Sequence, residues 1–151
     1  NEYVGLNNRM TDIHASIGRV QLGKLAGWTK IRQDNAAFLS QNITEAVTPT
    51  VPEGYVHVYH QYTIRVEGAT GEERDRFVTA LKEEHQVGSG VYYPIPNHRL
   101  PSLAPYAPGL ELPNTEKVAA ECVSLPVHPS LSQADLERIA EAVNKAAKAG
   151  A

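Results

Sequence analysis

Histidine is both a common metal ligand and a common acid–base group, and the chain contains six histidines. His57 and His60 lie three residues apart in a segment whose alternating pattern predicts a β-strand. At that spacing their side chains lie on opposite faces of a strand and cannot share one ion. Because the chain also has a single cysteine and no carboxylates at ligand spacing, the sequence predicts no metal site.

Two other catalytic patterns are missing from the sequence. No serine lies in a nucleophile elbow of the kind that serine hydrolases use. Gly88-Ser89-Gly90 is too short to be a phosphate-binding loop or a dinucleotide fingerprint. Neither serine hydrolysis nor a glycine-rich phosphate cradle is therefore predicted.

The strongest candidate for a binding segment is residues 91–98, with the sequence VYYPIPNH. Two tyrosines, two prolines and a histidine lie at the end of a predicted strand. They form a stiff aromatic loop whose hydrogen-bonding groups suit a hydroxylated or anionic ligand. A structural proline turn with exposed aromatic rings is the alternative, and the residues alone do not decide between the two.

Two further candidates carry weaker signals. His60 lies on the otherwise apolar face of the predicted strand, where a buried imidazole with hydrogen-bond partners is the more common explanation. Asn7, Asn8 and Arg9 directly precede a predicted helix. Side-chain amides, a guanidinium and the free N–H groups of a helix N-terminus can together bind an anion.

A long helix must position the N-terminal candidates. From Thr11 through Leu39, apolar residues recur at steps of three to five, which predicts one helix of about 30 residues with Thr11 as its N-cap. The first residues of this apolar stripe are Ile13, Ile17, Val20, Leu25, Trp28 and Ile31. At 1.5 Å per residue the helix spans roughly 45 Å, so we expect it to reach beyond its own domain.

The remaining chain predicts short strands and helices in alternation. Strands are expected at residues 56–66 and 87–93, with a short edge strand at 123–125. Helices are expected from the Thr70 capping box through Leu81, from Asn114 or Thr115 through Cys122, and from Ser132 through Val143. Residues 94–113 form a long proline-rich loop, a length typical of functional or disordered loops. This order predicts an α+β fold, with helices packed on a small sheet.

Composition restricts the class of protein further. The 151 residues include 14 basic and 17 acidic side chains, for a net charge of −3, and 42% are hydrophobic. This balance is typical of one globular domain and excludes a disordered tail and a strongly basic nucleic-acid binder. No apolar run approaches the roughly 20 residues that cross a bilayer, so no membrane partner is predicted. The single Cys122 and the lack of a secretory leader predict a cytoplasmic protein.

Several segments together resemble the DegT-type nucleotide-sugar aminotransferases. Residues 5–22 resemble the family's G-x-N-x-R-M…A-A-x-G…Q-L run, and residues 59–65, 91–98 and 125–129 resemble three further motifs in the family's order. The match spans nearly all of the chain. Two positions depart from the family pattern: Tyr92 stands where the family usually has histidine, and Ser16 replaces the second alanine.

The resemblance implies the aspartate-aminotransferase fold (fold type I) and pyridoxal 5'-phosphate as cofactor. The reaction would transfer an amino group, commonly from glutamate, to a nucleotide-linked keto-sugar. This chain would be the C-terminal portion of a homodimeric enzyme. Residues 1–48 would form the active-site-contributing segment and the interdomain helix, and residues 49–151 the small α+β domain. Asn7 would contact the cofactor phosphate of the partner subunit, while Arg9, His60, Tyr93 and His98 would bind the sugar nucleotide.

The family's Schiff-base lysine does not appear in its expected context. The family places this lysine before the G-x-N-x-R-M segment, and the chain begins at Asn1 without an initiator methionine. We therefore expect a longer parent chain, and we predict no catalytic residue and no activity for this segment alone. The alternative hypothesis is a free-standing α+β module that binds a small ligand or a partner without catalysis.

Overall fold

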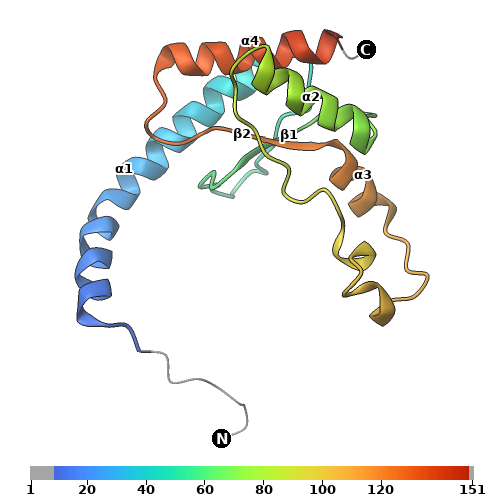
Figure 1. Cartoon of the computed structure of the whole chain (residues 1–151). Coiled ribbons are helices and arrows are strands. Elements are labelled where there is room, and N and C mark those ends of the chain that lie inside the picture. Colours follow the sequence, from blue (N-terminus) through green and yellow to red (C-terminus); the bar gives the residue numbers. More distant parts are fainter. Residues whose placement is uncertain (1–8, 150–151) are drawn as a thin grey trace, which may run out of the picture.

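The computed structural model describes residues 9–149, so the predictions on Asn7 and Asn8 lie outside the described residues. The elements in chain order are α1 (Asp12–Asn42), β1 (Tyr62–Arg65), α2 (Gly71–Glu83), the 3₁₀ turns η1 (Asn97–Arg99) and η2 (Ala104–Tyr106), α3 (Pro113–Glu121), β2 (Cys122–Leu125) and α4 (Gln133–Ala149). Figure 1 shows an arch, in which α1 and the segment from η1 to α3 extend from a body made of the sheet, α2 and α4.

The sheet is small and antiparallel. Strand β1 pairs with β2, with Tyr62 opposite Leu125 and Arg65 opposite Cys122. Single bridges extend it on both sides, from Val47 to Arg65 and from Gly90 to Ser124. Strand β2 is therefore hydrogen-bonded on both sides, and all four of its residues are buried, which shows that both faces of the strand are covered. The prediction of an edge strand at 123–125 is wrong for this reason.

Both of the longer predicted strands are wrong in extent. Of residues 56–66 only Tyr62–Arg65 form a strand. Tyr59 has a φ of +47°, which breaks the extended backbone. Side chains of α1 also bind carbonyl oxygens of this segment: Arg32 donates to the oxygen of Tyr59 at 3.2 Å and Gln33 to that of His57 at 3.0 Å. Residues 87–93 contribute only the bridge at Gly90.

The predicted helix starts are confirmed at three of four positions. The Thr11 hydroxyl accepts a hydrogen bond from the His14 N–H. Thr70 and Glu73 form a capping box, and Ser132 and Asp135 exchange the equivalent bonds at the start of α4. The predicted cap of α3 is wrong, because this helix begins at Pro113 and its cap residue makes no side-chain hydrogen bond. Proline suits a first helical position because the N–H it lacks has no partner there.

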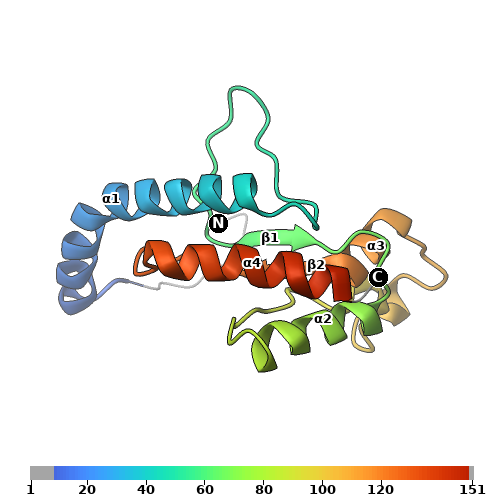
Figure 2. The ribbon, with the colours of Figure 1, turned by 90° about the horizontal axis from the view of Figure 1, so that it is seen from above.

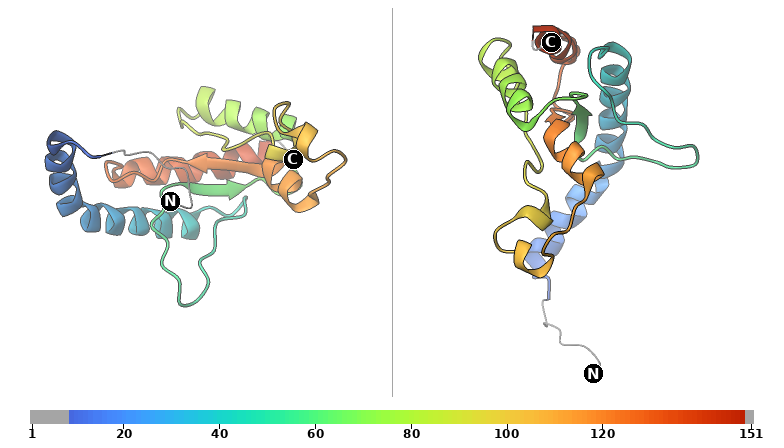
Figure 3. Two further views of the ribbon diagram at one scale, coloured as in Figure 1. Left: turned by 90° about the horizontal axis from the view of Figure 1, so that it is seen from below. Right: turned by 90° about the vertical axis from the view of Figure 1, so that its right-hand side faces the viewer.

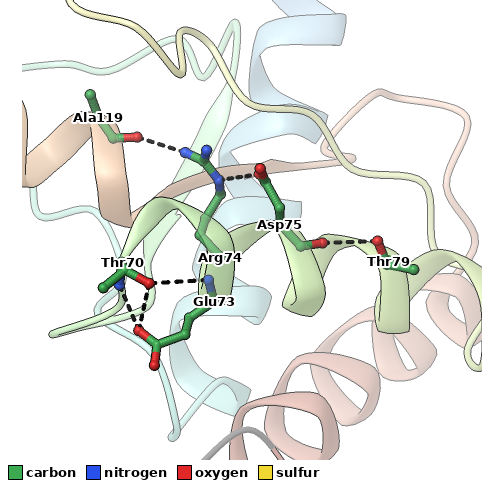
Figure 4. Close-up of polar contacts among 6 residues, drawn as sticks. All are labelled: Thr70, Glu73, Arg74, Asp75, Thr79 and Ala119. Atoms are coloured by element: carbon green, nitrogen blue, oxygen red, sulfur yellow. Dashed lines mark hydrogen bonds and ion pairs between the residues drawn. The ribbon is translucent and has the colours of Figure 1, made fainter.

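A buried arginine connects α2 to the end of α3. The side chain of Arg74 is 4% exposed, and its Nη1 donates to the carbonyl oxygen of Ala119 at 2.6 Å. Its Nε binds the Asp75 carboxylate at 2.7 Å, as Figure 4 shows beside the capping box of α2. These two bonds satisfy a charge that would otherwise be costly to bury, and they fix α3 next to α2.

The hydrophobic core lies between the sheet and the helices α1, α2 and α4. Helix α4 packs between α1 and α2 (Figure 2), and α3 lies on the other side of the sheet from α4 (Figure 3). Fully buried core side chains include Leu39, Tyr62, Ile64, Leu81, Val123 and Val143. This arrangement confirms the predicted α+β class, with helices on a small sheet.

Only the last third of α1 contributes to this core. Asn35, Ala36 and Leu39 are its buried residues. The apolar stripe before them is exposed, from 73% at Ile13 to 38% at Trp28. The helix therefore extends beyond the body, as its length predicted (Figure 1). None of the helices within residues 9–149 is both long and apolar enough to cross a membrane.

Candidate ligand-binding site

A hollow of about 750 Å³ lies between the segment 92–98 and helix α3. Its lining residues are Tyr92, Tyr93, Ile95, Pro96, Asn97, His98, Leu112, Asn114, Thr115, Val118, Ala119 and Cys122. Aliphatic, aromatic, amide and hydroxyl groups are thus combined on one concave surface. Such a mixture is typical of sites that bind organic ligands by apolar contact and orient them through a few polar groups.

A second hollow, of about 680 Å³, lies between α2 and the end of α4. Four glutamates line it, and it contains none of the predicted site residues. Arg76 and Lys148 offset two of these four charges, and the remaining negative charge is unsuited to an anionic ligand. The hollow beside α3 is therefore the better candidate.

The bridge to β2 fixes the start of the binding segment. Gly90 exchanges two backbone hydrogen bonds with Ser124, of 3.0 and 2.7 Å. The ring of Tyr92 folds back over this glycine so closely that a Cβ on Gly90 would lie 2.8 Å from ring atoms. Tyr93, the next residue, is 75% exposed at the rim of the hollow. The position of Tyr92 therefore depends on the missing side chain of Gly90.

We expect Gly90→Ala to displace the ring of Tyr92, because a Cβ at 2.8 Å leaves no room for it. The expected result is an altered fluorescence or NMR signal of Tyr92 and weaker ligand binding in the hollow. Gly88→Ala is the matched control, since no atom lies within 4 Å of a Cβ at that position. Equal effects of both variants on Tyr92 would contradict this prediction.

His98 is the buried polar residue of the hollow. Its side chain is 5% exposed, and its Nε2 lies 2.8 Å from Oε1 of Glu116 on the first turn of α3. Arg99 donates to the same oxygen from Nε at 3.1 Å and from Nη2 at 2.8 Å. The hydrogen bonds from His98 and then from Arg99 lower the pKa of Glu116 from 4.5 to about 2. Glu116 is therefore ionised at neutral pH and only accepts hydrogen bonds.

The structure brings Tyr93 and His98 together on one hollow but places Arg9 and His60 elsewhere. His60 is exposed in a bend before β1, so its prediction on a buried strand face is wrong. The strand starts two residues later, at Tyr62, and the face that His60 would share does not form. Arg9 is exposed ahead of the N-cap of α1 and does not line the hollow. The role predicted for each of these residues stays a prediction.

Glu116 and Arg99 are the site residues that sequence reasoning missed. An acidic residue in the first turn of a helix is usually explained by the helix dipole alone. Only the fold shows that the first turn of α3 faces residues 98 and 99, eighteen and seventeen positions earlier. The one sequence signal available was the pair of basic residues directly following the proline-rich run.

All six lysines of the chain are exposed. Five of them pair with a carboxylate: Lys30 with Asp34, Lys82 with Glu83, Lys117 with Glu121, Lys145 with Glu141 and Lys148 with Glu45. Lys24 lies over the ring of Trp28, 5.7 Å from its centroid. A Schiff-base lysine instead needs a desolvated site that favours the neutral amine. Within residues 9–149, no group of three or more His, Cys, Asp or Glu side chains is arranged to hold a metal ion.

Several solved structures share this fold. DesV from S. venezuelae matches with a TM-score of 0.85 and 28% identity, over 97% of this chain and 39% of that chain. The aminotransferase TlmJ from Streptoalloteichus hindustanus matches with a TM-score of 0.82 and 27% identity, over 98% of this chain and 39% of that chain. The chain therefore has the small α+β domain fold of fold type I aminotransferases.

The sequence model of the DegT/DnrJ/EryC1/StrS aminotransferase family matches residues 1–144. The chain belongs to this family, which confirms the resemblance seen in its motifs.

Two curated bacterial relatives match most of this chain. The "pleiotropic regulatory protein" of Geobacillus stearothermophilus is 36% identical over 93% of this chain and 38% of its own length. The dTDP-3-amino-3,6-dideoxy-alpha-D-galactopyranose transaminase of Aneurinibacillus thermoaerophilus is 31% identical over 96% of this chain and 39% of its own length. The chain thus spans about two fifths of these relatives, a share that fits a C-terminal portion.

Proposed function

We propose that this chain is the C-terminal portion of a pyridoxal-phosphate-dependent aminotransferase that acts on a nucleotide-linked keto-sugar. In this proposal the amino donor is glutamate, the enzyme is a cytoplasmic homodimer, residues 1–48 link two domains, and residues 49–151 form the small domain. The observation that carries the proposal is the hollow beside α3, where Tyr93 and His98 meet. Its hydroxyl, amide and imidazole groups complement a sugar nucleotide, and its apolar residues cover the rings.

The N-terminal segment of this chain suits one end of the cofactor, and its lysines do not suit the other. In the proposal Asn7 reaches the cofactor phosphate of the partner subunit. Arg9, two residues before the N-cap of α1, lies close by and offers its guanidinium to the sugar nucleotide. The exposed, ion-paired lysines do not fit the covalent anchor, so the proposal assigns the Schiff-base lysine to another part of the parent chain. When bound, pyridoxal phosphate supplies the electron sink for amino transfer.

The roles of this chain's own residues are then binding and orientation. Tyr93 at the rim offers a phenol and an aromatic face to the sugar nucleotide, and His98 offers an imidazole from inside the hollow. Tyr92 stands at the position where the family usually has histidine. It lines the same hollow as Tyr93 and His98, and in the proposal it restricts which substrates bind there. In the assembled enzyme, His60 contacts the ligand from the bend that precedes β1. The aliphatic residues that line the hollow exclude water from the bound ligand.

The proposal is tested by incubating this chain, and separately the parent chain, with pyridoxal phosphate. We expect a lysine-linked chromophore that survives gel filtration only in the parent chain, because each lysine here is solvated. Borohydride reduction followed by peptide mapping locates the modified lysine. A stoichiometric, single-site adduct on one of the six lysines of this chain would refute the assignment of the Schiff-base lysine to another part of the parent chain. Failure of the parent chain to bind the cofactor would refute the proposed activity itself.

A further inference from the structure

The contact between His98 and Glu116 determines which nitrogen of the imidazole carries a proton. A carboxylate has no hydrogen to donate, so Nε2 of His98 must be the donor across the 2.8 Å contact to Oε1 of Glu116. In the neutral imidazole Nδ1 is then an acceptor with a free lone pair. Within residues 9–149, Ser89 Oγ alone is a buried side-chain polar atom without a hydrogen-bond partner. Nδ1 of His98 is not such an atom, so it keeps some contact with the surface although the side chain is only 5% exposed.

The charges around the hollow also restrict its ligand. Arg99 places two of its donors on the same carboxylate oxygen that His98 contacts, at 2.8 and 3.1 Å. The negative charge of Glu116 thus offsets the guanidinium charge. None of the described residues that line the hollow is a lysine or an arginine. The hollow offers neutral hydrogen-bonding groups and aromatic faces but no uncompensated cation, so it is less suited to a diphosphate than to a sugar.

We propose that Glu116 is a positioning residue that holds His98 with Nδ1 as an acceptor, so that His98 binds a hydroxyl or N–H donor of the sugar ring and not a diphosphate oxygen. This inference rests on the proposed function, because it assumes that the hollow receives part of a sugar nucleotide. It identifies the sugar ring, and not the diphosphate, as the part of the sugar nucleotide that His98 contacts. A sugar carries hydroxyl donors, whereas an ionised diphosphate carries only acceptors.

The test compares ligands with and without the sugar. Calorimetry on the intact enzyme measures the dissociation constants of UDP-N-acetylglucosamine against UDP, and of dTDP-glucose against dTDP. We expect His98→Ala and Glu116→Gln each to weaken sugar-nucleotide binding about tenfold, the usual scale for a lost hydrogen bond to a charged or oriented group. Binding of UDP and dTDP is expected to stay unchanged in both variants.

A double variant separates positioning from simple damage. If Glu116 acts through His98, His98→Ala/Glu116→Gln binds the sugar nucleotides no more weakly than His98→Ala alone. Glu111→Gln is the matched control, since Glu111 is an exposed carboxylate in the loop before the same helix. It is expected to leave all four dissociation constants unchanged. Additive losses in the double variant would contradict a role exerted through His98.

Three results would overturn the inference. Equal weakening of UDP and UDP-N-acetylglucosamine by His98→Ala would show that His98 binds the diphosphate. Wild-type affinity in Glu116→Gln, with weakening in His98→Ala, would exclude positioning by Glu116. Nitrogen NMR of His98 in the unliganded enzyme tests the tautomer directly, and a proton on Nδ1, either in place of the one on Nε2 or in addition to it, would contradict the inference. If the wild type binds none of the four probes, the proposed function fails, while the NMR result still decides the tautomer.

Discussion

Replacing Glu121 with alanine is expected to destabilise the domain by about 1.5–3 kcal/mol, the scale for losing hydrogen bonds to a buried charged group. Glu121 is the last residue of α3, and its side chain is 2% exposed. Its Oε2 accepts from Arg65 Nη1 at 2.6 Å and its Oε1 from the backbone N–H of Gly68 at 2.9 Å. The carboxylate thereby joins the end of β1, the turn after it and the α3–β2 junction, so its loss affects all three.

The pH dependence of this effect follows from the carboxyl group. Burial raises the pKa of Glu121, but the hydrogen bonds from Gly68 and Arg65 and the charge of Lys117 together lower it below 4.5. A carboxyl whose folded pKa is depressed stabilises the fold above its unfolded pKa and loses this contribution as pH falls through the folded value. The difference between the wild type and Glu121→Ala is therefore expected to be largest at neutral pH and to shrink below pH 4.5.

Urea unfolding at pH 7 and at acid pH measures both parts of this prediction. Glu141→Ala is the control, because Glu141 also pairs with a lysine, at 2.6 Å, but on the surface with a 64% exposed side chain. Surface ion pairs contribute little, so the midpoint of this variant is expected to match the wild type. A Glu121→Ala variant as stable as Glu141→Ala at pH 7 would show that the buried pair does not hold the sheet to α3.

The parts of the fold that the sequence predicted well depend on neighbours along the chain. A capping box needs only residues three positions apart, and the Thr70–Glu73 and Ser132–Asp135 boxes form as predicted. A strand forms only with a partner strand, and the local residues of a segment do not show which distant segment that partner is. Residues 56–61 alternate in polarity like a strand, yet their backbone binds α1 through Arg32 and Gln33 instead of a neighbouring strand.

The same distinction applies to the candidate site. Tyr93 and His98 were predictable because one proline-rich segment carries both of them. Glu116 was not, because its contact with His98 requires the loop that contains η2 to fold back on α3. His60 was assigned to a buried face because its polarity pattern assumes a strand that begins six residues too early, at Val56 instead of Tyr62.

Substituting leucine by alanine is expected to destabilise the chain in one part of α1 and to have little effect in the other. Leu39→Ala removes a fully buried side chain from the core and is expected to cost about 2–5 kcal/mol, the range for a leucine cavity. Leu25→Ala removes a side chain on the same helix that is 53% exposed. In this chain alone its effect is expected to stay within about 0.5 kcal/mol, as for other surface substitutions. Urea unfolding of the two variants measures this difference.

The same two variants, Leu25→Ala and Leu39→Ala, also test the interdomain role of α1 when they are made in the parent enzyme. The stripe from Ile13 to Ile31 exposes a continuous apolar face, which is costly in water unless another surface covers it. If the proposed interdomain role is right, Leu25→Ala lowers the stability of the parent enzyme markedly while remaining neutral in this chain. Leu39→Ala lowers both, because its contacts lie within the small domain. A neutral Leu25→Ala in both contexts would refute burial of the stripe, and with it the assignment of α1 as the helix that joins two domains.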